Sequence, residues 1–300
     1  MSKSHLSSKR SFAYALLLLN TILWGLSPPI IKVALNFVSI NQFLLGRYIL
    51  ASLIFLPIYF LTQKKAHLEI RNLKLVILLA LLGTPLTLIP LYEGIKLTSS
   101  IESSILTATG PLLIIIGGRI FLHEKITQNE KIGLIIALIG TILLTLGPVV
   151  IDGPGFKISL LGNFLILGSN LIWTAFLLLV KKLKVDASQI SLVSYLTAIP
   201  VFAILLFFEP SSLNTKYLIL NTSAILGIVY MAVAGSIIAF WAYTKGQEYV
   251  EASEAAVFTY LQPLITFPLA YFWLHESISS VGLAACLLIA AGVYVSEYHG

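Results

Sequence analysis

Two histidine–glutamate pairs are the residues whose types and spacing come closest to a metal site in this 300-residue chain. The pairs are His123-Glu124 and His275-Glu276. A zinc protease motif needs a second histidine four residues after the first, so that both side chains lie on one helical face. Thr127 and Ser279 stand at those positions. We therefore expect no metal site at either pair.

Two glutamates, Glu102 and Glu254, begin long apolar runs. A carboxylate in this position could gate a cavity or exchange a proton with it. It could equally cap the free N–H groups of the first helical turn, and Ser99-x-x-Glu102 matches a capping box. Both interpretations stay open.

Arg47 is the cation best placed for a gating or coupling role. It lies about 8 Å into its apolar run, at about 1.5 Å per residue, which is deep enough to face a cavity. The alternative is that its long side chain extends to the lipid headgroups.

Two prolines, Pro111 and Pro263, are expected to break helices. Proline leaves the carbonyl four residues earlier without its helical partner, and those residues are Thr107 and Thr259. A ligand or a threonine hydroxyl can satisfy the freed carbonyl. The alternative is a packing kink without a ligand.

Aromatic and amide side chains gather near the centres of the apolar runs. They are Trp24, Trp173, Tyr260, Asn20, Asn170 and Gln262. Rings with polar tips suit a partly apolar organic solute, so we expect these residues, with Thr107 and Thr259, to form a substrate-binding site. The asparagines could instead link helices. Apart from tyrosines, no ionisable side chain stands at these centres, which favours a neutral or zwitterionic solute.

Composition indicates that the elements carrying these residues span a membrane. Hydrophobic residues make up 58% of the chain and charged ones 11%, and the mean hydropathy is +0.95. Ten transmembrane helices are predicted, near residues 12–35, 42–61, 73–93, 99–121, 131–149, 160–182, 189–208, 218–244, 253–274 and 279–297. The net charge of +6 does not indicate nucleic acid, because the basic residues lie in short runs between apolar stretches.

The loop charges predict the orientation. With the N-terminus inside, the cytoplasmic segments hold 13 basic residues and the outer loops hold 3, as the positive-inside rule requires. We expect an all-α, multi-pass protein of the plasma (inner) membrane of a bacterium, with both termini cytoplasmic.

The chain is a tandem duplication. Pro111, His123 and Glu124 recur 152 residues later as Pro263, His275 and Glu276, and Trp24 aligns with Trp173 at an offset of 149. We divide it into residues 1–150 and 151–300, with five helices each. Since five is odd, the second half is inverted in the membrane, which is the architecture of alternating-access carriers.

Several local motifs add a family resemblance. They are Trp24-Gly25 with Pro28 and Pro29, Arg47, and the paired endings Pro111 to Thr127 and Pro263 to Ser279. With the five-plus-five pattern, the chain resembles the EamA-like family of the drug/metabolite transporter (DMT) superfamily. The resemblance implies secondary transport, commonly export, of small metabolites such as amino acids, through a central cavity and without a cofactor. His123 and His275 depart from the family, which usually has a small residue there.

We therefore expect a secondary transporter for an amino-acid-like metabolite rather than an enzyme. A passive channel or a lipid-translocating protein is the alternative, and a membrane-embedded enzyme is a weaker one. An enzyme would gather its carboxylates and histidines at one interface, and a channel gives no reason for inverted halves. The expected partners are the small-molecule substrate, the lipid bilayer and a proton as candidate coupling ion; a monomer is plausible.

Overall fold

The computed structural model describes residues 3–62, 73–123, 127–151, 160–209, 221–250, 255, 258–276 and 280–297. Its regular elements in those ranges are all helices, and no strand occurs there. The first half contains α1 (Lys3–Gly25), α2 (Ser27–Ala34), α3 (Ile40–Thr62), α4 (Leu73–Leu81), η2 (Leu82–Leu86), α5 (Thr87–Leu97), α6 (Ser100–Thr107), α7 (Gly110–Gly117), η3 (Gly118–Leu122) and α8 (Gln128–Ile151). The second half contains α9 (Leu160–Leu183), α10 (Ala187–Phe207), α11 (Thr222–Tyr230), η5 (Met231–Phe240), α12 (Trp241–Gln247), η6 (Phe258–Leu261), α14 (Gln262–Leu274) and α15 (Ser280–Glu297).

Seven helical segments of the described chain are long and apolar enough to cross a membrane. They are Lys9–Ala34, Ile40–Thr62, Leu73–Leu97, Ser100–Leu122, Leu160–Leu183, Ala187–Phe207 and Thr222–Gln247. Lys131–Gly140 in α8 and Ser280–Gly292 in α15 are apolar but shorter. The seven long segments coincide with seven of the expected spans, and the total of ten stays a prediction.

The distribution of side chains is that of a membrane protein. Leu61, Phe207 and Phe272 are 81%, 80% and 77% exposed, whereas the polar side chains of Arg47 and Asn170 are buried. A large exposed apolar surface marks a region that is shielded from water by another molecule. Because seven segments are long and apolar enough to span a membrane, that surface faces lipid. The protein is therefore a multi-pass membrane protein.

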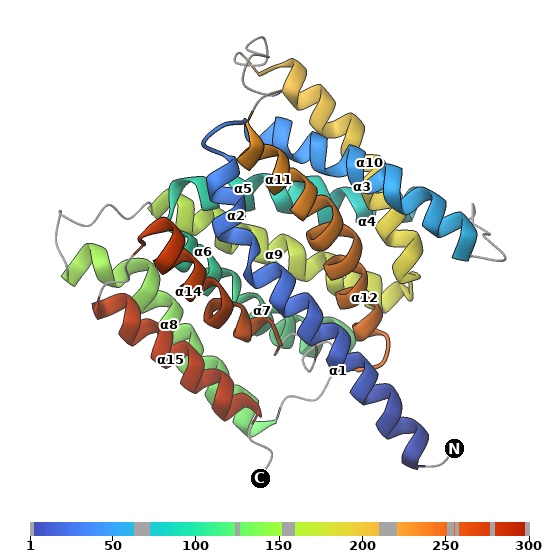
Figure 1. Ribbon diagram of the computed structural model, residues 1–300. Coiled ribbons are helices and arrows are strands. Elements are labelled where there is room, and N and C mark those ends of the chain that lie inside the picture. The colour runs from blue at the N-terminus through green and yellow to red at the C-terminus, as the bar shows by residue number, and fades with distance from the viewer. Residues whose placement is uncertain are drawn as a thin grey trace.

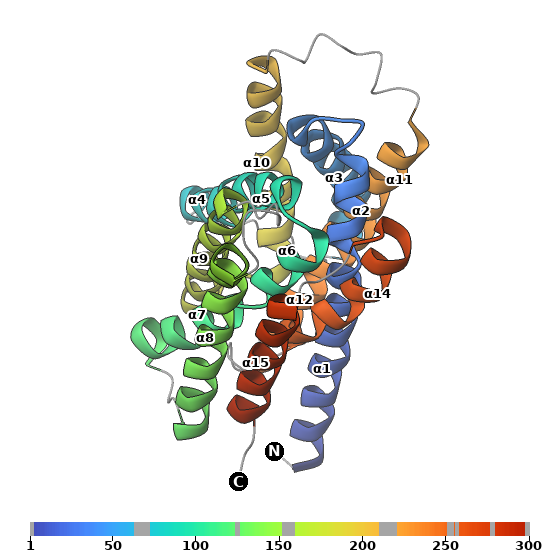
Figure 2. The same ribbon diagram turned by 90° about the vertical axis from the view of Figure 1, so that its left-hand side faces the viewer.

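Both ends of the chain lie at the same end of the molecule. The start of α1 and the end of α15 both lie at the lower end in Figures 1 and 2, and the start of α3 and the end of α10 lie at the opposite end. An even number of crossings produces this arrangement.

Helices α8 and α15 pack side by side at the edge of the bundle (Figures 1 and 2). Two glycines, 152 residues apart in the sequence, permit this close approach. A Cβ atom at Gly292 would lie 2.6 Å from the backbone nitrogen of Ala137, and one at Gly140 would lie 3.0 Å from the carbonyl oxygen of Ala285. Small residues let helix backbones approach in membranes, and here the contact is within one chain.

The helix breaks lie next to prolines. Pro111 is in the first turn of α7, after the break at residues 108–109, and Pro263 is in the first turn of α14. A missing N–H costs little at these positions, because first-turn N–H groups have no helical partner. Pro85 lies within the π-helix η2. The breaks leave backbone carbonyls that other helices can reach.

Candidate functional site

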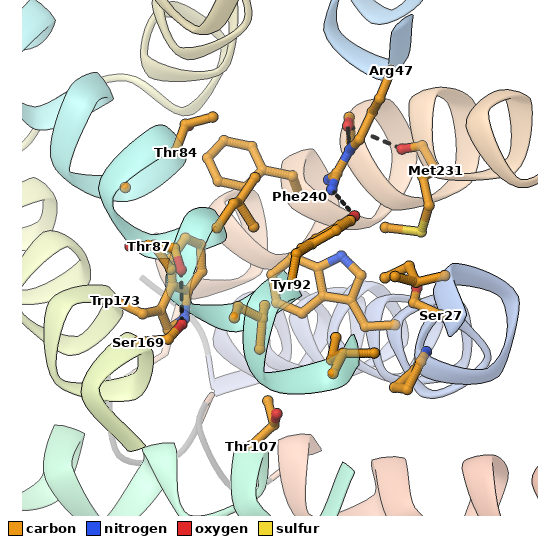
Figure 3. A pocket seen from close by; sticks show the side chains of 18 of the residues that line it. Ser27, Arg47, Thr84, Thr87, Tyr92, Thr107, Ser169, Trp173, Met231 and Phe240 are labelled. Atoms are coloured by element: carbon orange, nitrogen blue, oxygen red, sulfur yellow. Dashed lines mark hydrogen bonds between the residues drawn. The ribbon is translucent and has the colours of Figure 1, made fainter. Parts of the chain in front are cut away.

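A cavity of about 130 Å³ is lined by helices of both halves (Figure 3). The first half contributes Trp24, Ser27, Pro28, Ile31, Arg47, Tyr48, Gly83, Thr84, Thr87, Leu88, Leu91, Tyr92, Ile95, Ser104 and Thr107. The second half contributes Ser169, Asn170, Trp173, Tyr195, Met231, Ser236, Phe240 and Gln262. No aspartate or glutamate is among these lining residues.

Arg47 projects from α3 into the cavity and is only 5% exposed. Its Nε donates to Ser236 Oγ at 2.7 Å, and its Nη1 donates to the Tyr92 hydroxyl at 2.7 Å (Figure 3). Both partners are neutral. The cavity therefore carries a positive charge, which differs from the uncharged centre expected from the sequence, because a long side chain extends well beyond its backbone position.

The partners of Arg47 are themselves held in place. Ser236 Oγ donates to the Met231 carbonyl at 3.0 Å within the π-helix η5, and the Tyr195 hydroxyl donates to the Ser236 carbonyl. Tyr92 is fully buried on α5. π-helical turns are frequent at functional sites, and here one of them positions a serine beside the guanidinium group.

Trp24 on α1 and Trp173 on α9 form an aromatic wall of the cavity. Their ring centroids are 5.7 Å apart, with the rings edge-on at 71°. Trp24 Nε1 donates to the Gly235 carbonyl at 3.0 Å, and Trp173 packs against Phe176 with centroids 5.0 Å apart. Such a wall offers a partly apolar solute a rigid surface.

Polar side chains of the cavity gather beside the break between α6 and α7. Figure 3 places Thr107 on the opposite side of the cavity from Arg47. Asn170 Nδ2 donates to the Leu106 carbonyl at 2.8 Å. Ser104 Oγ and Gln262 Nε2 are buried and have no hydrogen-bond partner among the described residues. Buried polar atoms are normally paired, so this side of the cavity retains hydrogen-bonding capacity.

Of the predicted substrate-binding residues whose side chains are described, two do not line the cavity. Asn20 Nδ2 donates to the Ala239 carbonyl at 2.9 Å, so Asn20 links helices, as the alternative interpretation held. Thr259 lies on η6 and is not among the lining residues. Near the expected free carbonyl of Thr107, the carbonyl of Leu106, one residue earlier, accepts a hydrogen bond from Asn170 Nδ2.

Of the two predicted gating carboxylates, Glu102 and Glu254, only Glu102 lies within the described residues. Glu102 closes a capping box with Ser99, which supports the capping interpretation, and it also accepts a hydrogen bond from Thr98 Oγ1 at 2.6 Å. Glu254 lies outside the described residues, and so does the side chain of Tyr260.

Sequence reasoning missed Tyr92, Tyr195 and Ser236. Tyr92 lies near the end of its expected span, where a tyrosine is equally expected in an interfacial aromatic belt. The internal repeat could have identified Ser236, because Ser236 follows Thr84 by 152 residues and both residues line the cavity.

Pairs of equivalent hydrogen bonds relate the two halves. Asn20 and Ser169 are 149 residues apart, and they donate to the carbonyls of Ala239 and Thr87, which are 152 residues apart, each at 2.9 Å. The next residues along the chain repeat the pattern. Thr21 Oγ1 donates to the Phe258 carbonyl and Asn170 Nδ2 to the Leu106 carbonyl, each at 2.8 Å. Each half thus contributes the donors that hold a broken helix of the other half.

The two histidines of the His-Glu pairs also have equivalent positions. His123 ends η3 with φ of 58° and His275 ends α14 with φ of 53°. This left-handed conformation is common at helix C-termini and favours glycine. Both histidines are therefore backbone caps of their helices.

Apolar membrane-spanning helices from both halves surround one cavity, which is typical of helical membrane transporters. Comparison with known proteins assigns the family. The EamA-like transporter family matches residues 11–146 and again residues 160–298, so the chain belongs to this family. Its similarity to "Uncharacterized transporter YetK" of Bacillus subtilis (strain 168) is 28% identity over 258 residues, 83% of this chain and 76% of that protein. It is 25% identical over 299 residues to the "Probable amino-acid metabolite efflux pump" of Salmonella typhimurium, covering 94% of each chain. A solved crystal structure shares the fold with a TM-score of 0.69, at 18% identity, over 97% of this chain and 96% of that one.

Proposed function

We propose that this protein is a ten-helix secondary transporter, built from two inverted five-helix halves at residues 1–150 and 151–300, that moves a small metabolite by alternating access. The observation that carries the proposal is the cavity to which both halves contribute. The equivalent hydrogen bonds described above support it, because each half holds the other at matching places. Two inverted halves can exchange conformations, so that one cavity opens to each side in turn.

The lining side chains support an amino-acid-like solute. Trp24 and Trp173 would contact its apolar part, and Thr107, Asn170 and Gln262 would contact its polar groups. The small volume of the cavity, about 130 Å³, favours a metabolite over a larger molecule. The name of the Salmonella relative, an amino-acid metabolite efflux pump, supports export as the direction.

The proposed location is the plasma (inner) membrane of a bacterium, with both termini in the cytoplasm. The shared end of α1 and α15 (Figure 2) supports an even number of crossings. The excess of basic residues in the expected cytoplasmic segments supports this orientation.

Transport by the purified protein in proteoliposomes tests the proposal. Vesicles are loaded with unlabelled amino acids, and the uptake of each labelled amino acid is compared with its uptake into empty vesicles. A carrier gives saturable uptake that the internal amino acid accelerates. Uptake that rises in proportion to concentration and ignores the internal amino acid would indicate a channel instead.

Tryptophan variants connect this transport to the cavity. Trp24→Ala and Trp173→Ala should each raise the KM for the transported solute about tenfold, because an aromatic contact is lost. Trp273→Ala is the matched control, since Trp273 is exposed on α14 and does not line the cavity. Unchanged kinetics in both cavity variants would place the solute elsewhere.

A further inference from the structure

We propose that Arg47 binds a carboxylate group of the transported solute, so that the solutes are organic acids and zwitterionic amino acids rather than amines or neutral molecules. This inference rests on the proposed transport function and narrows its substrate class. It starts from the positive charge of Arg47, which no described lining residue neutralises.

Within the part of the chain that the structure describes, Arg47 is a buried cation without a counter-charge. None of the described residues that line the cavity is acidic, and the two ion pairs seen among the described residues, Lys32–Glu276 and Lys245–Glu248, do not include Arg47. A buried charge is costly unless it is paired, and charged side chains within membrane spans commonly mark substrate or ion pathways. A bound anion would supply the missing charge.

The donors of Arg47 are only partly used. A guanidinium group has five N–H donors, and the hydrogen bonds of this side chain engage Nε with Ser236 and Nη1 with Tyr92. Among the described residues, Nη2 donates to no protein acceptor. A planar carboxylate can accept two parallel hydrogen bonds from a guanidinium group, which makes arginine well suited to carboxylates. The two neutral partners hold the group ready for that contact.

The rest of the cavity fits an organic carboxylate better than an inorganic anion. From Arg47 the cavity extends past the tryptophan wall to Thr107 on the opposite side (Figure 3). A chloride ion would occupy only the Arg47 side. An organic acid would place its carboxylate at Arg47, its apolar part against Trp24 and Trp173, and any further polar group near Ser104, whose hydroxyl has no partner among the described residues.

Matched ligand pairs test this inference on the full-length protein. Binding is measured by thermal stabilisation and calorimetry for three carboxylates and their primary amides: L-phenylalanine, L-leucine and 3-phenylpropionate. We expect at least one carboxylate to bind at least about tenfold more tightly than its amide, and chloride to produce no comparable stabilisation. Equal binding within every pair, no binding by any carboxylate, or the same stabilisation by chloride would overturn the inference.

Variants assign the preference to one side chain. Arg47→Gln should abolish the carboxylate preference, and Arg47→Lys should weaken binding but retain the preference. Arg119→Gln, at an exposed position on η3 outside the cavity, should change neither. If Arg47→Gln does not fold, binding of the carboxylates and their amides to the unaltered protein and to Arg47→Lys still tests the inference.

The two proposals fail in different ways. Solute exchange in proteoliposomes that treats each carboxylate and its amide equally would contradict the role of Arg47 and leave the carrier intact. A carboxylate preference in binding, together with no exchange of any bound solute, would contradict the carrier and leave the Arg47 site.

Discussion

Lys32 and Glu276 form an ion pair that joins the two halves, with Lys32 Nζ lying 3.2 Å from Glu276 Oε1. Lys32 is in the last turn of α2, and Glu276 follows the end of α14. Lys32 also donates to the Thr98 carbonyl, and Glu276 Oε2 accepts from the backbone N–H of Ile101 at 3.2 Å. The pair therefore connects three segments at one end of the bundle, and its side chains are only 29% and 12% exposed.

Removing the charge of Glu276 should loosen this connection. Glu276→Gln is expected to lower the free energy of unfolding by about 1–2 kcal/mol, because a shielded ion pair and a charge-assisted hydrogen bond both weaken. Thermal unfolding in detergent measures the change. Glu248→Gln is the control, since Lys245 and Glu248 pair within one half and close together in sequence. Equal effects of the two variants would argue against a role of Lys32–Glu276 in joining the halves.

The hydrogen bonds at the helix breaks should stabilise the fold. Asn170→Ala removes both hydrogen bonds of Asn170 Nδ2, to the Leu106 carbonyl and to Thr109 Oγ1, and should cost about 1–2 kcal/mol of unfolding free energy, because the Leu106 carbonyl keeps the Thr109 hydroxyl as a donor. Thr21→Ala should cost less, because the single hydroxyl hydrogen of Thr21 is shared between the carbonyls of Phe258 and Leu17. Denaturation of both variants gives the ranking, and a larger loss in Thr21→Ala would contradict it.

The contact between α8 and α15 should be intolerant of added atoms. Gly292→Ala places a methyl group 2.6 Å from the backbone nitrogen of Ala137, so we expect a loss of about 1–3 kcal/mol. Gly168→Ala in α9 is the control, because a Cβ there meets nothing within 4 Å, and alanine favours the helix by up to about 1 kcal/mol. Melting temperatures should therefore move in opposite directions, and a stable Gly292→Ala would refute the close packing.

The two cavity tryptophans should differ when each becomes phenylalanine. Trp24→Phe loses the hydrogen bond from Nε1 to the Gly235 carbonyl and should cost about 1 kcal/mol more than Trp173→Phe. The structure gives Trp173 ring contacts but no such bond among the described residues. Thermal unfolding of both variants without ligand measures the difference, and its absence would speak against the indole contact.

Much of the fold could be predicted from sequence, because a lipid-spanning helix needs a long apolar run. All seven long apolar segments begin and end within a few residues of their expected positions. The π-helices η2, η3 and η5 were not predictable, since they depend on tertiary packing rather than on local propensity.

The candidate site was predictable only in part. Trp24, Trp173, Asn170, Thr107, Gln262 and Arg47 line the cavity, because central polar and aromatic residues of a membrane helix face the protein interior. Asn20 was indistinguishable from these by position, yet it does not line the cavity, and its amide donates to the Ala239 carbonyl. The direction of a hydrogen bond between helices distant in sequence follows from tertiary packing, which periodicity alone does not contain.

The most direct test of the central claim is the accessibility of Thr107 from each side of the membrane. Thr107→Cys is made in a Cys286→Ala background, and a membrane-impermeant thiol reagent is added to sealed right-side-out or inside-out vesicles. A lipid-facing control, Leu138→Cys, is expected to stay unlabelled. Alternating access predicts that Thr107→Cys is labelled from both sides and protected by the transported solute. Labelling from one side alone, or from neither, would contradict a cavity that opens to each side in turn.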